Sequence, residues 1–244
     1  MASLLTATGQ AAAERKFFTG VSLAVLAVVF VGFARSFFLR PLFPDWPAPP
    51  ESIYVVHGAV FSAWIVLLVA QTSLIAAGRV DVHRTMGALG AVLALAMTVL
   101  ATLGALTAAN RATGFVGIPV PPLQFLAVPL FDMAMFVAFV TAAIVQRHNP
   151  QSHKRWMLLG TINIITAAVA RWPVIRDLGP PGYFALTDLF IVALAWWDWR
   201  RHGRLHRATL VGGLLIILAQ PLRLAVSGTE AWLAFASWAT GLLR

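Results

Sequence analysis

Long apolar runs make up most of this chain, and short polar or Pro- and Gly-rich segments separate them. A transmembrane helix needs about 20 consecutive, mainly apolar residues to cross the hydrocarbon core. Residues 230–243 form a shorter amphipathic tail, which we expect to lie at the membrane interface. The pattern predicts one all-helical domain over residues 1–244, an integral membrane bundle of seven transmembrane helices. These spans fall near residues 17–39, 53–77, 84–108, 123–146, 155–172, 183–199 and 207–226.

The basic residues between these runs predict an orientation for the chain. Most Arg and Lys residues fall on one side of the predicted membrane, as Arg15, Lys16, Arg84 and Arg204 do. Cytoplasmic loops of membrane proteins carry an excess of Lys and Arg. We therefore expect a cytoplasmic N-terminus and a periplasmic C-terminus, with residues 17–39 kept as an uncleaved first span because this run is too long for a signal peptide.

A short pattern recurs at the predicted cytoplasmic starts of the third, fifth and seventh spans. A histidine precedes a basic residue, and a glycine follows seven residues after the histidine. The pattern predicts a leading helix followed by an internal repeat of three helical hairpins. The pairs are His83 with Gly90, His153 with Gly160, and His206 with Gly213.

The composition supports a membrane protein and excludes several other classes. Apolar residues make up 59% of the chain and charged residues 11%, about half the charged share of a soluble domain. The net charge of +9 does not indicate a nucleic-acid partner, because no basic stretch is interleaved with aromatic residues. The absence of cysteine excludes disulfides and thiolate metal sites. Membrane lipids are the first expected partners.

Ionisable residues inside the predicted spans are the strongest candidates for function. A charge near the bilayer centre costs about 2.5 kcal/mol or more, so such residues face the bundle interior and find partners. We expect a polar pocket in the outer half of the membrane that binds or processes a small or lipophilic ligand. Acid, base or cation-binding groups would be Asp132 and Asp188, and His57 would carry protons. The expected ligand-binding residues are Arg171, Arg223, Gln220, Trp64 and Asn163.

The same residues have a purely structural interpretation. Two buried Asp–Arg pairs and a hydrogen-bonded histidine would fix the register of the helices without binding any ligand. An accessory subunit of a larger membrane complex, which contacts partner subunits through its lipid-facing surfaces, would show the same composition. The sequence leaves open whether the protein is an enzyme.

A second candidate site consists of histidines at the predicted cytoplasmic side. His83 and His153 begin neighbouring helices and would be able to ligate a b-type haem, with Arg84, Lys154 or Arg155 pairing its propionates. The alternatives are headgroup-level anchoring and a zinc or similar metal site. His202 and His206 form an HxxxH pair that would share one helical face, but the surrounding arginines oppose a cation there.

Several motifs resemble a family of small bacterial polytopic membrane proteins whose domain has no assigned function. The motifs are HGAVFSAW (57–64), QTSLIAAGRVDVHR (71–84), HRTMGALG (83–90) and HKRWMLLGTINIITAAVAR (153–171). The resemblance implies a bundle of six or seven spans in the bacterial cytoplasmic (inner) membrane, with motif positions at His57, His83, His153 and Arg171. The chain is also weakly similar to transmembrane b-type cytochromes, although its fourth span has no histidine to partner His57.

Overall fold

The computed structural model describes residues 2–47, 49 and 51–243, and these residues contain helices and no strand. Five short helical segments accompany the long helices: η1 (Ala34–Phe38), η2 (Arg40–Leu42), α4 (Pro122–Phe125), α7 (Pro173–Asp177) and α10 (Glu230–Gly241). The long helices are α1 (Ala2–Phe33), α2 (Ser52–Ala76), α3 (Val80–Asn110), α5 (Ala127–Val145), α6 (Pro150–Val169), α8 (Gly179–His202) and α9 (Arg207–Ser227). The all-helical prediction is therefore confirmed.

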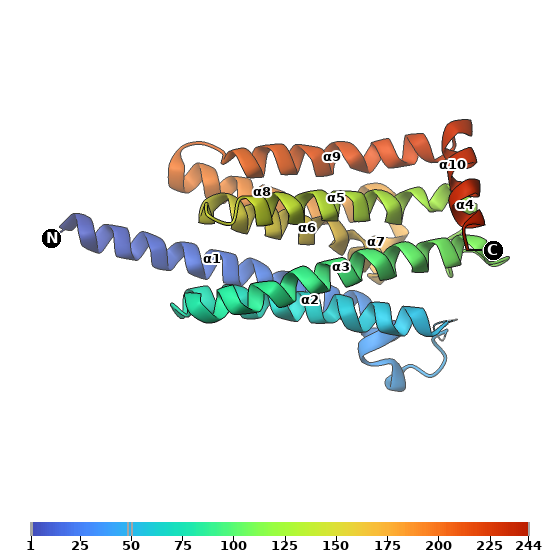
Figure 1. Cartoon of the computed structure of the whole chain (residues 1–244), viewed down its shortest axis with the longest axis horizontal. Coiled ribbons are helices and arrows are strands. Elements are labelled where there is room, and N and C mark those ends of the chain that lie inside the picture. The colour runs from blue at the N-terminus through green and yellow to red at the C-terminus, as the bar shows by residue number, and fades with distance from the viewer. Residues whose placement is uncertain (1, 48, 50, 244) are drawn as a thin grey trace.

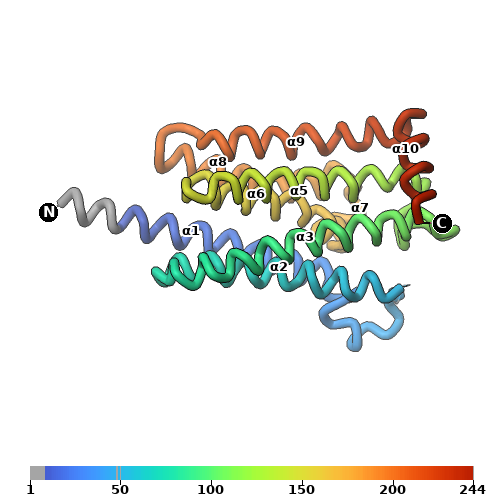
Figure 2. The backbone as a smooth tube through the Cα atoms, viewed as in Figure 1, coloured from blue at the N-terminus to red at the C-terminus, as the bar shows by residue number. Residues whose placement is uncertain are grey.

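The long helices lie side by side in one bundle, and α10 crosses one end of it (Figure 1). Helix α6 lies at the centre, because it contacts α1, α5, α8 and α9. The part of α1 drawn in blue begins beyond the opposite end of the bundle (Figure 2). Helix α10 is fixed to its end by hydrogen bonds from Trp232 Nε1 to the Leu123 carbonyl (2.8 Å) and from Asn110 Nδ2 to the Thr240 carbonyl (2.8 Å).

Five helical segments of the described chain are long and apolar enough to cross a membrane: Gly9–Phe38, Ser52–Ala76, Val80–Asn110, Pro122–Val145 and Arg207–Ser227. Helices α6 and α8 are as long as a span, but they are not apolar enough to count among these five segments. Their low hydropathy has a local cause, because α6 begins with PQSHKR and α8 ends with WDWRRH. The fold is thus that of a multi-pass membrane bundle, and the crossing of α6 and α8 stays a prediction.

The bundle exposes large apolar side chains on its outer surface. Leu95 on α3 and Leu218 on α9 are 67% and 63% exposed, and many valines and leucines resemble them. A soluble monomer rarely exposes such a continuous apolar surface, whereas lipid is a suitable solvent for it. The exposed surface therefore supports the membrane assignment independently of the hydropathy of single helices.

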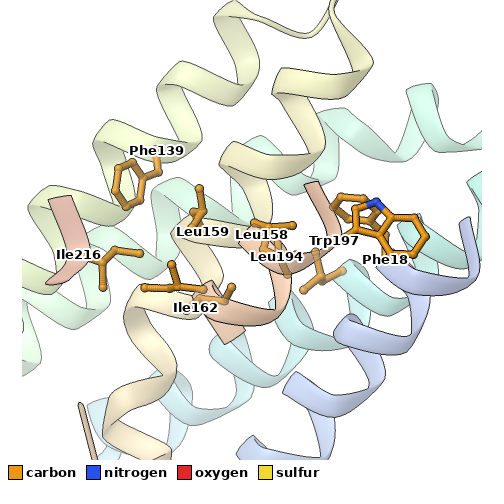
Figure 3. Close-up of a cluster of buried hydrophobic side chains, with 10 residues drawn as sticks. Phe18, Phe139, Leu158, Leu159, Ile162, Leu194, Trp197 and Ile216 are labelled. Carbon is orange, nitrogen blue, oxygen red and sulfur yellow. The ribbon is translucent and has the colours of Figure 1, made fainter. Parts of the chain in front are cut away.

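Aliphatic and aromatic side chains fill the centre of the bundle around α6. Leu158, Leu159 and Ile162 on α6 pack against residues of four neighbouring helices, and all three are nearly fully buried. The surrounding residues are Phe18 on α1, Phe139 on α5, Leu194 and Trp197 on α8, and Ile216 on α9 (Figure 3). This packing makes α6 the element on which the other helices are positioned.

Four long helices begin several residues before their predicted spans: α1 at Ala2, α3 at Val80, α6 at Pro150 and α8 at Gly179. The early starts of α6 and α8 have local chemical reasons. Helix α6 begins at Pro150 because the Asn149 side chain accepts hydrogen bonds from the N–H groups of Gln151 (3.1 Å) and Ser152 (3.2 Å). Helix α8 begins at Gly179, and its prolines stand in the first turn, where a missing N–H does no harm. Each of these two predicted spans therefore starts a few residues too late.

The glycines of the predicted repeat all lie against the preceding long helix. A Cβ atom added at Gly90 would lie 3.5 Å from Leu67 on α2, and one at Gly160 would lie 3.3 Å from Phe139 on α5. One at Gly213 would lie 2.8 Å from Ile191 on α8. Small residues let helix backbones approach closely in membranes. Each of the three predicted hairpins thus has the same kind of close contact between its two helices. The repeat itself stays a prediction.

Candidate functional site

Arg223 on α9 and Asp132 on α5 form a buried ion pair, through Nη1 and Oδ1. Asn163 on α6 donates to the backbone carbonyl of the same aspartate at 2.9 Å. Asp132, Arg223 and Asn163 are all more than nine-tenths buried. Three helices therefore meet at one closed polar contact, in which the carboxylate and the guanidinium neutralise each other.

Asp188 on α8 belongs to the same polar region through Gln220. The amide of Gln220 donates to Asp188 Oδ1 at 2.7 Å, and Gln220 stands three residues before Arg223 on one face of α9. The Arg223 guanidinium also lies 5.0 Å from the ring centroid of Phe184, one turn before Asp188 on α8. Asp188 is only half-buried, and no described residue donates to its Oδ2 atom. This carboxylate is the open end of the network, in which the buried Nε atom of Arg223 also has no hydrogen-bond partner among the described residues.

The other predicted ligand-binding residues lie elsewhere. The His57 ring stacks on Phe61 at 4.0 Å between centroids. The Arg171 guanidinium donates to the Ala167 carbonyl at 2.5 Å and covers the Phe33 ring. Neither residue has a hydrogen bond or an ion pair with Asp132 or Asp188 within the described chain. The structure thus gathers five of the eight predicted residues: Asp132, Asp188, Asn163, Gln220 and Arg223.

Trp64 serves as packing rather than as a free ligand-binding surface. It is 2% exposed, its Nε1 donates to Thr161 Oγ1 on α6 at 3.1 Å, and its ring meets Phe136 edge-on. The hydrogen bond satisfies its polar atom, so the side chain joins α2 to the centre of the bundle.

Two surface hollows stand out in the described part of the chain. One lies between η1, η2 and the start of α2, with a volume of about 430 Å³, and the other lies between α5 and α10 beside Phe131 and Trp232. Neither is lined by Asp132 or Asp188.

The structure brings His83 and His153 together, as their positions at the starts of α3 and α6 predicted. Their ring centroids are 6.3 Å apart and the ring planes are nearly perpendicular. His153 Nδ1 lies 2.9 Å from the Ala143 carbonyl, and this contact leaves Nε2 free. His83 Nδ1 is buried without a partner among the described residues. No third His, Asp or Glu completes a metal-binding group with them in that part of the chain.

A second buried ion network was not foreseen from the sequence. Arg155 on α6 donates through Nε to both oxygens of Asp198 on α8 (3.1 and 3.3 Å), and neither side chain is exposed. Thr209 and the backbone N–H of His206 donate to the same carboxylate. Arg155 also donates to the carbonyl and the side chain of Gln151 (2.8 and 2.7 Å). The signal was present, because an aspartate in the run WWDW needs a cationic partner inside a bundle.

The HxxxH pair does not share one helical face, contrary to the prediction. Gly203 ends α8 in the left-handed conformation (φ of 65°), and His206 is the residue that caps the start of α9. His206 Nδ1 accepts a hydrogen bond from the Ala208 N–H at 3.1 Å. Burial lowers the pKa of His206 below its usual value, and the nearby positive charge of Arg155 lowers it further. His206 is therefore a neutral structural cap.

No protein-family model, curated protein or solved structure matches this chain. The resemblance carried by residues 57–64, 71–90 and 153–171 accordingly stays an expectation. The function has to be inferred from the side chains and their geometry.

Proposed function

We propose that this is a seven-span protein of the bacterial cytoplasmic membrane that binds a lipophilic ligand through the carboxylate of Asp188. The N-terminus would lie in the cytoplasm, and the end of the bundle that holds Asp132, Asp188 and Arg223 would face the periplasm. The observation that carries the proposal is the half-buried Asp188 carboxylate, in which Gln220 holds one oxygen and no described residue donates to the other.

The polar residues of the cluster have different roles in this proposal. Arg223 neutralises Asp132, so this pair fixes the positions of α5 and α9 and is not available to a ligand. Gln220 fixes the orientation of the Asp188 carboxylate. The second oxygen is a hydrogen-bond acceptor in an apolar setting, where it suits a ligand whose polar group donates, such as an amine or a hydroxyl.

Native mass spectrometry of the detergent-purified protein tests this function. We expect a bound small molecule in the wild-type protein and its loss in Asp188→Asn, because a neutral amide is a much weaker acceptor than a carboxylate. Asp177→Asn is the matched control, since Asp177 is an exposed aspartate on neighbouring α7. A ligand that Asp188→Asn retains as fully as the control does would refute the proposal.

The second candidate function is electron transfer through a b-type haem, and the proximity of His83 and His153 favours it. His83 and His153, whose ring centroids are 6.3 Å apart, would be the two nitrogen ligands of the haem iron, which would supply the one-electron chemistry. The Ala143 carbonyl would orient the His153 ring, as a backbone partner does in many metal sites. Of the predicted propionate partners, Lys154 forms an ion pair with Glu14 and Arg155 forms one with Asp198.

An absorption spectrum of the purified protein decides on this candidate. A Soret band that disappears in His153→Ala, and that persists in His148→Ala, would support haem ligation, because His148 is an exposed histidine just before α6. A colourless wild-type protein, purified from cells with sufficient haem, would eliminate it.

A further inference from the structure

The chain between α1 and α2 folds into a pocket that the sequence analysis did not anticipate. The π-helical turn η1 closes with a hydrogen bond from the Leu39 N–H to the Ala34 carbonyl (2.7 Å), and η2 follows directly. This folded connection is light blue in Figure 1. With the start of α2 it lines an open pocket of about 430 Å³. Ligand pockets in proteins range over about 300–1,000 Å³, so the size suits a small molecule.

Apolar groups form most of the pocket wall. Phe37, Phe43, Pro44, Pro49 and Val55 line it. Phe37 lies against α2 at Gly58, where a Cβ atom would stand 2.6 Å from the Phe37 ring. Glycine at this position therefore lets the ring lie flat on the helix. The wall suits a flat or aliphatic body.

The charged residue among those that line the pocket is an arginine. Arg40 lines it, and its buried Nε atom has no hydrogen-bond partner among the described residues. Arg35 adds a second cation, with its guanidinium 5.7 Å from the ring centroid of Phe43 and 6.0 Å from that of Trp46. Within the described chain, no carboxylate lines the pocket and no acidic side chain forms an ion pair with either arginine. A buried donor without a partner carries a cost that an anionic ligand would remove.

We propose that this pocket binds a small amphipathic carboxylate, whose anionic group pairs with Arg40 and whose apolar body lies between Phe37, Phe43 and Val55. A free small molecule fits better than a two-chain phospholipid, which the pocket is too small to enclose. This site does not involve Asp188, so it is independent of the function proposed above. The two sites also differ in chemistry, because the Asp188 carboxylate binds a hydrogen-bond donor, whereas the Arg40 guanidinium binds an anion.

The test uses the full chain in nanodiscs of zwitterionic lipid, with 4-fluorobenzoate as the probe and fluorine NMR as the readout. We expect saturable binding of 4-fluorobenzoate and much weaker binding of the neutral 4-fluorobenzamide. Arg40→Gln should weaken the binding of the carboxylate about tenfold or more, because it removes a charge-assisted contact. Val55→Trp should abolish the binding by filling the pocket.

Two control variants show whether a loss of binding is specific to this pocket. Arg176→Gln removes an exposed arginine of α7 and should leave the binding constant unchanged, as should Asp188→Asn. Equal affinity for the benzoate and the benzamide would overturn the proposal without any variant, so a misfolded Arg40→Gln protein does not prevent a decision. Binding that requires anionic phospholipid in the nanodisc would also overturn it, because the site would then recognise a lipid headgroup.

Discussion

Arg155 and Asp198 form an ion pair whose two side chains are both completely buried, beside the start of α9, whereas Arg223 pairs with Asp132 near the end of that helix. Arg155 lies on the central helix α6 and Asp198 lies on α8. The Asp198 carboxylate also accepts a hydrogen bond from the backbone N–H of His206 at the start of α9, so it connects three helices. Each end of the α6–α9 region therefore has its own buried ion pair. Such pairs cost desolvation energy, and their best-supported use is to select one arrangement of the helices.

Breaking the Arg155–Asp198 pair should destabilise the protein strongly. Arg155→Met leaves a buried carboxylate without its cation, which costs about 3–5 kcal/mol in known cases. The double variant Arg155→Met with Asp198→Leu should recover a large part of this loss, because no unpaired charge remains. Unfolding in mixed micelles, followed by tryptophan fluorescence, measures the free energy of unfolding of the single and the double variant. Arg147→Met changes an exposed arginine nearby and serves as the control.

Replacing Asp132 and replacing Asp188 should have different effects on the stability of the protein. Asp132→Asn leaves the buried Arg223 guanidinium unpaired and should cost about 3–5 kcal/mol in the same unfolding assay. Asp188→Asn weakens only a hydrogen bond from Gln220 at a half-buried position, so about 0.5–1.5 kcal/mol is expected. A loss at Asp188 as large as that at Asp132 would show that Asp188 is a structural residue and would weaken its assignment as a ligand site.

The sequence predicts the helices well because their main determinant is local. A long apolar run bounded by charges or by Pro and Gly specifies a helix whatever its neighbours are, and each long helix matches a predicted run to within a few residues at its C-terminal end. The connection around Arg40 lies outside these apolar runs. Its fold depends on the contact between Phe37 and Gly58, which no local pattern reveals.

The partners of the polar residues depend on helix packing, which the sequence specifies only indirectly. Depth in the membrane correctly predicted that Asp132 and Arg223 would meet. Depth alone also placed His57 and Arg171 with them, but the direction of a side chain around its helix decides the contact, and His57 stacks on Phe61 instead. Arg155 was predicted only as a propionate partner, because its span was predicted to begin at residue 155. The structure places it inside α6, paired with Asp198.

Gly32 should be intolerant of any side chain. A Cβ atom at this position would overlap the backbone carbonyl of Ala168, where α1 crosses α6. Gly32→Ala should therefore destabilise the protein by about 1–3 kcal/mol, although alanine favours a helix. Gly20→Ala on the same helix is the control, because nothing lies within 4 Å of its added Cβ atom, and it should be neutral or stabilising. Equal effects of the two variants would contradict the close crossing.

The cap at His206 should make the stability depend on pH. The folded protein lowers the pKa of His206 through burial and the charge of Arg155, while Asp198 opposes the shift. The folded state therefore favours the neutral ring, which accepts the Ala208 N–H. Its contribution to stability is complete above the ordinary histidine pKa of about 6.5, and it is lost as the pH falls through that value towards the folded one.

The variant His206→Asn isolates this contribution. Asparagine is a good helix N-cap that does not titrate, and the backbone N–H at this position can still donate to Asp198. Unfolding curves between pH 8 and 5 should show the wild-type protein losing stability relative to the variant on the acidic side. The charged groups that act on His206, namely Arg155, Lys154, His202 and Asp198, are present in both proteins and cancel to first order in the difference. A difference that stays constant with pH would mean that His206 has the same pKa in the folded and unfolded states, and that the cap does not favour the neutral ring.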